Sequence, residues 1–423
     1  MGNKDKKIYY GWYIVGLGAL IYFFSGPGQT YSVSVFIDYY IEKFGWSRTV
    51  ISSFYSIATL ISGFSLPFIG NLIDSKGHRK STIAVSILFS ITCLWMSMIS
   101  ASWMILIGFI FIRLFGQGSM TLISSVLIPQ WFIKKRGRAL SIMSLGGVLG
   151  AAAIPPINSF LIESRGLTFA WMFWAAALIF IMLPVAILFI RNRPEDIGLL
   201  PDGVESIENV AEPGDIQTQD KIDFSWTLEE AKTTRAFWFM LFCMGVPSLI
   251  NTGITFHMIS IVGEKGYDPL FGAYVLSITA LSQIPSNFLA GFVVEKVKVN
   301  IVKGINYIVF GLAMVMLVFA QGKTPLIIYG VVQGVSVAFD AVSTNVLWSD
   351  YYGREHLGKI RGLTMTVMVI GSALGPLPFG AAFDFFQSYT QILLILLILP
   401  LMASWASFVS PSPDYNEEID KSL

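Results

Sequence analysis

Three ionisable side chains stand within long apolar stretches of this 423-residue chain: Arg113, His257 and Asp340. A charge at the centre of a bilayer costs at least roughly 2.5–3.5 kcal/mol on insertion scales, so each residue is by default a functional-site hypothesis. A guanidinium can bind the anionic group of a solute or pair with an acid, and Asp340 is such an acid or a proton or cation site. Imidazole titrates near neutrality, so His257 can carry a proton or donate to a solute oxygen.

Each of the three also has an interpretation without chemistry. Arg113 can be structural and bond to backbone or neighbouring helices, and His257 can be a fully bonded histidine with only a packing role. Asp340 can lie in cytoplasmic water if its span is shorter than the apolar run. At about 1.5 Å per helical residue, Arg113 lies roughly 15 Å from Trp103 and Asp340 roughly 12 Å from Trp348. These depths favour positions within the bilayer.

Polar residues at helical spacing extend these positions into stripes. Arg113 is followed by Gln117, Asp340 is preceded by Gln333, and His257 is preceded by Asn251. The predicted solute-binding residues are therefore Arg113, Gln117, His257, Asp340, Gln333 and Asn251, with Tyr22 and Gln29 from the first apolar run. Asp340 and His257 are the candidates for coupling to protons.

The composition shows what kind of chain must position these residues. Hydrophobic types make up 54% and charged types 13%, with a mean hydropathy of +0.66. This number of charges is too small to cover a water-soluble surface. A large part of the surface must therefore face lipid. The net charge of +1 gives no field that would attract nucleic acid. Cys93 and Cys243 lie in apolar runs and have neither metal-site nor disulfide spacing.

Long apolar runs in lipid must be helices, because each backbone polar group has to bond within its own segment. About 20 residues cross the hydrocarbon, and the first run is long enough to be a retained helix and not a signal peptide. Twelve spans are expected, at about 11–37, 49–72, 81–100, 103–130, 138–161, 169–190, 236–262, 270–294, 301–320, 325–348, 360–383 and 390–410.

The loops predict the orientation of these spans. Of the 28 Lys and Arg residues, 22 fall on the side of the termini and five in the opposite loops, while Arg113 lies inside a span. Three of the 22 are assigned to the 295–303 loop. By the positive-inside rule, both termini are expected in the cytoplasm of a multi-pass protein of the cell membrane.

A long polar loop and an internal repeat predict the domain organisation. Residues 191–235 divide six spans from six and are expected to be a cytoplasmic linker. Residues 136–150 (RGRALSIMSLGGVLG) and 361–375 (RGLTMTVMVIGSALG) match in register at six-span separation. We expect an all-α membrane protein with six-helix bundles at 1–190 and 236–410 and a cytoplasmic tail at 411–423.

Motifs in the first half resemble those of the major facilitator superfamily. Gly70, Asp74, Gly77 and Arg79 lie between spans two and three, as in its cytoplasmic signature, although Ser75 stands where a basic residue is usual. The resemblance implies that this motif helps to close a cytoplasmic gate.

Two further motifs extend the resemblance. The stretch from Arg113 to Gly118 resembles the superfamily's intramembrane Arg motif. Residues 131–146 resemble the span-five signature of the monocarboxylate transporter and oxalate/formate antiporter group, and Tyr10-Gly11-Trp12 resembles that group's first signature without its acidic residue.

The resemblance implies a fold in which spans 1, 4, 7 and 10 line a central cavity. Arg113, His257 and Asp340 lie in spans four, seven and ten. The expected function is secondary active transport by alternating access, with a monocarboxylate or similar organic anion moved with protons or by exchange. One departure weakens the prediction of an anionic solute. Asn287 stands about where the group carries an anion-pairing Arg in span eight.

Two alternatives remain open. The aromatic content, with 33 Phe, would suit a cavity for export of amphipathic or hydrophobic compounds. A membrane sensor that binds a ligand without moving it is an alternative of another class. No P-loop, metal-ligand spacing or nucleophile–base pair is recognised, so no enzyme activity, cofactor or metal is expected. The expected partners are a small-molecule solute, the lipid bilayer and protons, without nucleic acid or a required protein partner.

Overall fold

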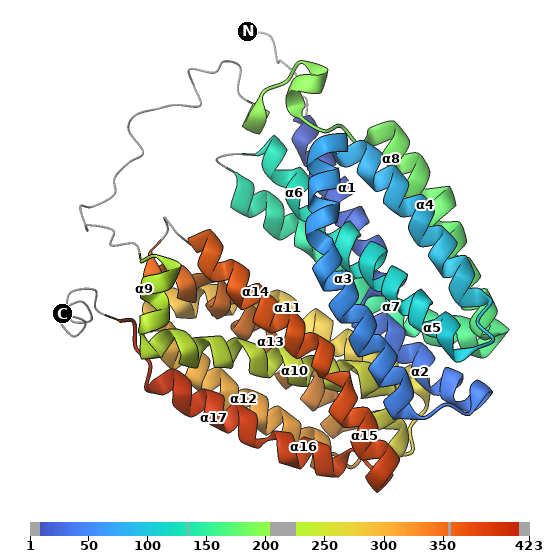
Figure 1. Cartoon of the computed structure of the whole chain (residues 1–423), viewed down its shortest axis with the longest axis vertical. Helices are drawn as coiled ribbons and strands as arrows, with labels where there is room; N and C mark the ends of the chain where they lie inside the picture. The colour runs from blue at the N-terminus through green and yellow to red at the C-terminus, as the bar shows by residue number, and fades with distance from the viewer. Residues whose placement is uncertain (1–8, 133–134, 204–225, 354–356, 414–423) are drawn as a thin grey trace. The chain divides into compact units, whose positions relative to one another are not determined.

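A computed structural model describes residues 9–132, 135–203, 226–353 and 357–413, and these residues are almost entirely helical (Figure 1). Among them, ten helices are long and apolar enough to cross a membrane. Two further crossings are hidden by local breaks and merges, and they bring the described chain to the twelve spans that the sequence predicts.

The first span is broken in its middle. Helix α1 (Tyr10–Phe24) is followed by the single 3-10 turn η1 (Gly26–Gly28) and helix α2 (Thr30–Phe44). Pro27 lacks a backbone N–H, so the turn interrupts the ladder of helical hydrogen bonds. Gly28 is required for close packing, because a Cβ there would lie 2.8 Å from the Cα of Gly116. Each half is short, but together they make one crossing.

Spans five and six form one continuous segment of 52 residues at Arg138–Phe189. Its main helix, α7 (Arg136–Ala177), contains Gly166 at φ 85°, a conformation that breaks an α-helix and that glycine adopts without steric penalty. A π-helical turn, η3 (Leu178–Met182), and α8 (Leu183–Phe189) complete the segment. The turn at Gly166 therefore separates two crossings that lie in different directions.

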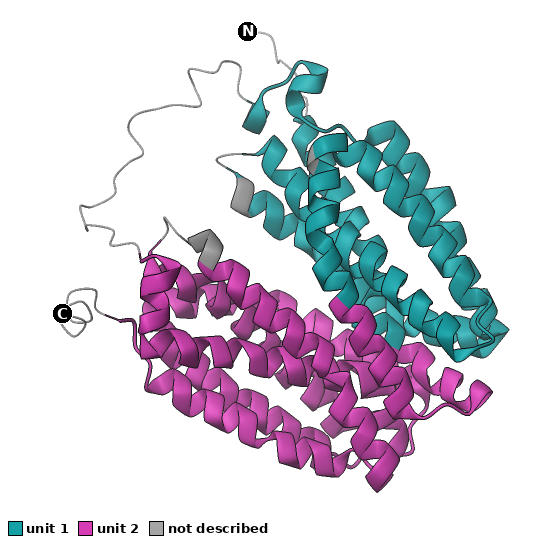
Figure 2. Cartoon of the chain, viewed as in Figure 1, with its two compact units in different colours: residues 1–33, 61–218 teal, residues 34–60, 219–423 magenta. Residues whose placement is uncertain are grey.

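The chain folds into two compact units, which are coloured separately in Figure 2: unit 1 at residues 1–33 and 61–218, and unit 2 at 34–60 and 219–423. In unit 1, helix α1 packs against α7, and α7 also packs against α4. The remaining unit 1 elements are the second part of α3 (Arg48–Lys76), α4 (His78–Ser97), α5 (Ser102–Ile112), the π-helix η2 (Arg113–Met120), α6 (Thr121–Trp131), and the turns η4 (Pro194–Ile197) and η5 (Pro201–Gly203).

Unit 2 holds the second group of spans. Helix α11 packs extensively on α13, α10 packs on α14, and α12 lies between α13 and α17. Its elements are α9 (Leu228–Thr233), α10 (Arg235–Glu264), α11 (Pro269–Lys296), α12 (Val299–Phe319), α13 (Lys323–Tyr352), α14 (Leu357–Leu374), α15 (Pro376–Phe386), α16 (Thr390–Leu396) and α17 (Ile398–Phe408). Residues 34–60, which the sequence analysis places in the first bundle, make their main contacts within this unit.

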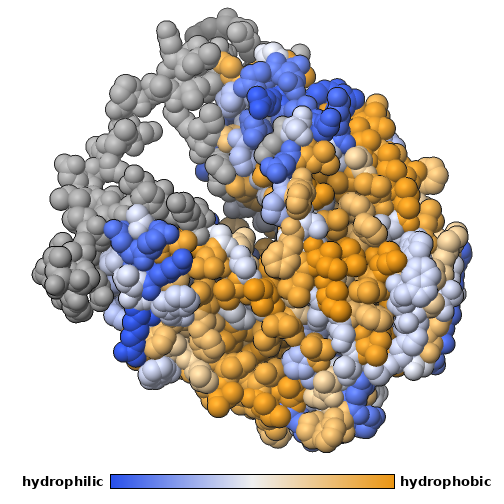
Figure 3. Space-filling model, viewed as in Figure 1, coloured by the Kyte–Doolittle hydropathy of each residue, from blue (hydrophilic) through white to orange (hydrophobic). Residues whose placement is uncertain are grey.

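Large apolar side chains cover the flanks of the helices in both units. Figure 3 shows hydrophobic residues over most of the visible helix surface and hydrophilic ones near helix ends. Phe68, Phe180, Phe288 and Phe385 are each more than 70% exposed. A contiguous apolar exterior of this kind is stable only in lipid, so the chain is a multi-pass membrane protein.

Candidate functional site

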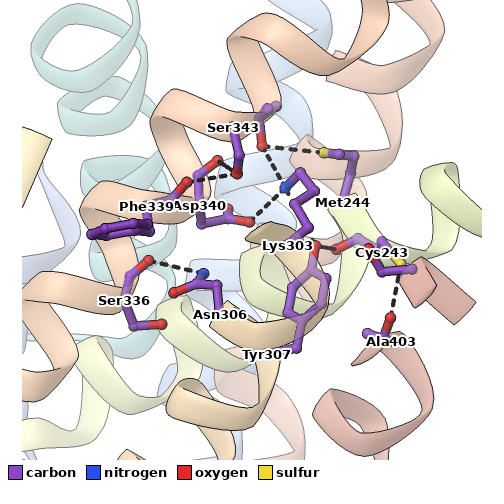
Figure 4. Close-up of polar contacts among 12 residues, drawn as sticks. Cys243, Met244, Lys303, Asn306, Tyr307, Ser336, Phe339, Asp340, Ser343 and Ala403 are labelled. Carbon is purple, nitrogen blue, oxygen red and sulfur yellow. Dashed lines mark hydrogen bonds and ion pairs between the residues drawn. The ribbon is translucent and has the colours of Figure 1, made fainter. Parts of the chain in front are cut away.

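Unit 2 contains a buried ion pair between Lys303 of α12 and Asp340 of α13 (Figure 4). The Lys303 Nζ lies 2.8 Å from Asp340 Oδ1, and it also donates to Thr344 Oγ1 at 2.9 Å and to Tyr307 Oη at 3.4 Å. These three acceptors satisfy all three donors of the ammonium group. The Lys303 side chain is 0% exposed and that of Asp340 is 18% exposed. The acid is therefore the partner that reaches accessible space.

Further bonds join this pair to neighbouring helices. The Tyr307 hydroxyl donates to the Cys243 carbonyl of α10 at 2.8 Å, and the Cys243 thiol donates to the Ala403 carbonyl of α17 at 3.3 Å. The contacts, drawn in Figure 4, connect four helices of unit 2 around one pair of charges. Because the pair is bonded on several sides, it is held in a fixed geometry.

Lys303 is not among the site residues predicted from the sequence, where it counts as a basic residue of the 295–303 loop. That assignment is wrong, because Lys303 lies inside α12 and is fully buried. Removing Lys303 from the 22 basic residues of that side leaves 21 against five, so the orientation argument is unchanged. The available signal was Asp340 itself, because a deep acid needs a counter-charge and Lys303 is the basic residue closest to span nine's interior.

The predicted residues Asn251 and Gln333 meet within unit 2. The Gln333 Nε2 of α13 donates to Asn251 Oδ1 of α10 at 2.5 Å. The Gln333 Oε1 atom is buried and accepts no hydrogen bond from the described residues. An unfilled acceptor in a membrane protein costs free energy unless water or a solute donates to it. This amide pair is thus a polar position that a solute donor can complete.

His257 of α10 belongs to a different cluster in unit 2. Its Nε2 lies 3.0 Å from the Pro376 carbonyl oxygen and 3.3 Å from Ser52 Oγ, and its Nδ1 lies 3.1 Å from Tyr389 Oη. A carbonyl can only accept, so Nε2 carries the hydrogen, and Nδ1 accepts from the tyrosine hydroxyl. The ring is 0% exposed and lies edge-on to Phe256. This geometry supports the packing role of a neutral, fully bonded histidine.

In unit 1, Arg113 begins the π-helix η2 and lies beside the break in the first span. Its Nη1 is 3.3 Å from Thr30 Oγ1, and the residue is 3% exposed. Gln29 Nε2 donates to Ser25 Oγ at 3.1 Å and to Thr121 Oγ1 at 3.4 Å. π-helical turns occur frequently at functional sites. The sequence allowed Arg113 as an ion-pair partner of Asp340, but in the structure Asp340 pairs with Lys303.

The other two unit 1 candidates lie on neighbouring elements. Gln117 of η2 has a buried Oε1 that accepts no hydrogen bond from the described residues. Tyr22 of α1 is partly exposed, and its ring packs so close to Gly147 that a Cβ there would lie 2.5 Å from the ring. The structure thus places Gln29, Arg113 and Gln117 near the broken first span.

The proposed gate motif is anchored within unit 1. Gly77 has φ 81° and joins α3 to α4. The Asn192 Oδ1 accepts the backbone N–H of Arg79 at 2.9 Å, and Arg79 Nη2 donates to the Ile187 carbonyl at 2.5 Å. Gly70 lies within α3, and the side chain of Asp74 lies outside the described residues. These contacts hold the α3–α4 turn against the end of α8.

A second polar cluster, which we call the Arg48 cluster, consists of Asp38, Arg48, Ser260 and Asp384 of unit 2. Arg48 Nη1 donates to Asp38 Oδ1 at 2.5 Å and to Ser260 Oγ at 2.6 Å. The Asp384 carboxylate accepts the backbone N–H groups of Arg48 at 3.2 Å and Thr49 at 2.9 Å. Carboxylates are stabilising at a helix N-terminus, so Asp384 caps α3. Arg48 is one of the five Lys and Arg residues that the sequence places in the loops opposite the termini.

The comparisons with known proteins agree with this architecture. The family model described as the Major Facilitator Superfamily matches residues 18–376 and, in a second match, 274–422. The solved structure of a bacterial homolog of the human lysosomal transporter Spinster, inward-facing and occupied, aligns with a TM-score of 0.71 at 14% identity, covering 96% of this chain and 97% of that one. The nucleoside transporter NupG aligns with a TM-score of 0.72 at 13% identity, covering 94% and 99%. At these identities the structures establish the fold alone.

Curated relatives match over shorter regions. The multidrug resistance protein MdtG of Enterobacter lignolyticus is 30% identical over 170 residues, which are 38% of this chain and 39% of that protein. The MFS transporter asaE of Aspergillus flavus is 29% identical over 213 residues, 48% of this chain and 46% of that protein. The matched region thus spans less than half the length of these relatives. The monocarboxylate subgroup suggested by span five stays a prediction.

Proposed function

This chain belongs to the major facilitator superfamily of transporters, and we propose that it exports amphipathic or hydrophobic compounds by alternating access. The observation that carries this proposal is the Lys303–Asp340 pair. Its base is fully buried and its acid is partly exposed, so an approaching solute meets a carboxylate and not a free ammonium. The pair is neutral overall and its accessible part is a hydrogen-bond-accepting carboxylate, so it favours a neutral or cationic amphipathic compound over an anion.

Two further observations favour this solute class. The amide acceptors of Gln117 and Gln333 are buried and unfilled among the described residues, so they suit a solute that brings N–H or O–H donors. MdtG, with which the chain shares a region of 170 residues, is named for multidrug resistance. Each amide, taken within its own unit, favours a solute that brings hydrogen-bond donors over one that carries only acceptors.

Proton coupling is proposed through Asp340. Its Oδ1 accepts from Lys303, and its carboxylate remains accessible enough to exchange a proton. His257 is a weaker candidate than the sequence suggested, because both of its ring nitrogens are already bonded and the ring is fully buried. Uptake of a proton at Asp340 would weaken its attraction to Lys303, which gives the pair two electrostatic states.

The test is flux in proteoliposomes with an imposed pH gradient. Ethidium, as a lipophilic cation, and labelled lactate are offered separately. We expect gradient-driven movement of ethidium, its loss in Asp340→Asn, and its retention in Asp350→Asn, a matched change at an exposed position of the same helix. Insertion of each variant is checked by its yield in membranes. Gradient-driven flux that is equal in Asp340→Asn and wild type would remove Asp340 from the coupling.

A monocarboxylate or similar organic anion is the second candidate. Arg113 favours it, because a guanidinium binds a carboxylate through two parallel hydrogen bonds. In the same proteoliposomes, lactate flux without ethidium flux would establish this candidate and overturn export of amphipathic compounds. Binding of either solute without flux would instead favour a sensor.

A further inference from the structure

An apolar cavity of about 230 Å³ lies where the end of α11 meets α12 and α13 in unit 2. It is lined by Val293, Val297, Val302, Ile305, Asn306, Val309, Val335 and Phe339. An apolar cavity of roughly 150 Å³ already holds a benzene-sized guest. The space is partly open at the protein surface, so a guest of this size can enter it from outside the helices.

The walls of the cavity offer almost nothing to a polar ligand. Asn306 is the one amide in the lining, and its Nδ2 donates to the Ser336 carbonyl at 3.1 Å. Water needs two to four polar partners in a buried site, which these walls do not supply. The cavity opens toward lipid, because Ile305 is 51% and Val297 is 38% exposed. Hydrocarbon from the bilayer is the guest that fits such walls.

Positive charge stands at the mouth of the cavity. Helix α11 ends at Lys296 and α12 begins at Val299, so Lys296 and Lys298 flank the lining residue Val297 at this junction. Both lysines are exposed, as is Glu295, which leaves one net positive charge over the segment. Basic residues beside transmembrane helix ends attract anionic lipid headgroups. The arrangement thus places two exposed basic residues next to a residue of the apolar lining.

We propose that this cavity binds one acyl chain of an anionic phospholipid of the surrounding bilayer, with the lipid phosphate held by Lys296 and Lys298. The apolar walls select a hydrocarbon chain, and the two lysines select an anionic headgroup over a zwitterionic one. This site lies beyond the proposed function, because it concerns the membrane and not the transported solute. It can be tested without any transport measurement.

The test is native mass spectrometry of the whole purified protein in micelles, titrated with phosphatidylglycerol or with phosphatidylcholine of identical chains. We expect wild type to retain one phosphatidylglycerol more tightly than phosphatidylcholine. Val335→Phe should fill the cavity and abolish retention, whereas the matched control Val331→Phe, one turn away on α13 and 42% exposed, should keep it.

Charge variants test the headgroup contact independently of packing. Each lysine near the surface contributes about fivefold to affinity, so Lys296→Gln/Lys298→Gln should weaken phosphatidylglycerol binding about 30-fold. The control Lys76→Gln/Lys80→Gln removes two exposed lysines from the corresponding loop of the first half and should change little.

Any of three results would overturn the proposal: equal retention of phosphatidylglycerol and phosphatidylcholine, unchanged phosphatidylglycerol affinity in the Lys296→Gln/Lys298→Gln variant, or phosphatidylglycerol retention in Val335→Phe. Ethidium is also added as a competitor. Displacement of the lipid by ethidium, if it is lost in Val335→Phe, would make the cavity a solute site and would overturn the lipid assignment as well.

Discussion

The buried pair makes a quantitative prediction about stability. Asp340→Ala leaves the Lys303 ammonium fully buried, with Thr344 and Tyr307 as acceptors but without a counter-charge. Breaking a buried pair by removing one partner costs about 3–5 kcal/mol, because an uncompensated charge stays behind. Lys303→Met leaves a carboxylate that is 18% exposed and keeps part of its solvation, so we expect a smaller loss of about 1–3 kcal/mol.

The double variant separates charge from packing. Lys303→Met/Asp340→Ala has no buried charge. It leaves the Thr344 and Tyr307 hydroxyl oxygens without the donor that Lys303 supplied, together with a small cavity. We expect it to lose about 1–2 kcal/mol, well below the summed losses of the single variants. The coupling energy is obtained from denaturant unfolding of all four proteins in one detergent, followed by tryptophan fluorescence. The controls are Lys323→Met and Asp350→Ala, which remove exposed charges from α13 and should change stability by about 0.5 kcal/mol or less.

Strict additivity would refute this reasoning. If the double variant loses as much stability as the two single variants together, then Lys303 and Asp340 do not interact in the folded protein. A double variant that is stable but lacks gradient-driven transport would instead show that the pair is retained for function and not for folding.

Three further predictions concern residues outside this pair. Arg113→Ala should insert normally and lose transport, as measured by flux per mole of protein; wild-type kinetics would make Arg113 structural at most. His257→Leu should lower the unfolding free energy by about 1–3 kcal/mol, because the Tyr389 hydroxyl loses its buried acceptor, and an unchanged pH profile would distinguish packing from coupling. Gly77→Ala should destabilise by about 1 kcal/mol or more, since φ is 81° and a Cβ would lie 2.9 Å from Asn192 Oδ1; equal thermal midpoints would contradict this strain.

The fold could be predicted from sequence because the bilayer imposes simple rules on apolar length. Helix length alone identifies ten of the twelve spans among the described residues, and it fails only where a helix is locally modified. The Gly26–Gly28 turn divides the first span, and Gly166 turns the chain without a polar loop between spans five and six. Apolar runs reveal that a segment crosses the membrane, whereas the exact break depends on backbone conformations that tertiary packing selects.

The candidate site could be predicted only in part. Depth in an apolar run identified Asp340 as unusual, but not its partner, because pairing between spans nine and ten depends on how the helices are rotated about their axes. Lys303 lies about one turn inside α12, and from sequence it is indistinguishable from a lysine that reaches back to water. His257 was identified for its chemistry, and its bonding to Tyr389 and Pro376 came from elements more than 100 residues away.

The Arg48 cluster differs from the Lys303–Asp340 pair in one respect that bears on motion. Its Arg48 and Asp38 side chains are 13% and 31% exposed, so solvent can take over each hydrogen bond as it is lost. Separating Arg48 and Thr49 from Ser260 and Asp384 would therefore have a low enthalpic barrier, and it would become easier at high ionic strength. The start of α3 is thus held by hydrogen bonds that can break and re-form many times without unfolding of α3 or of the helices that carry Asp38, Ser260 and Asp384.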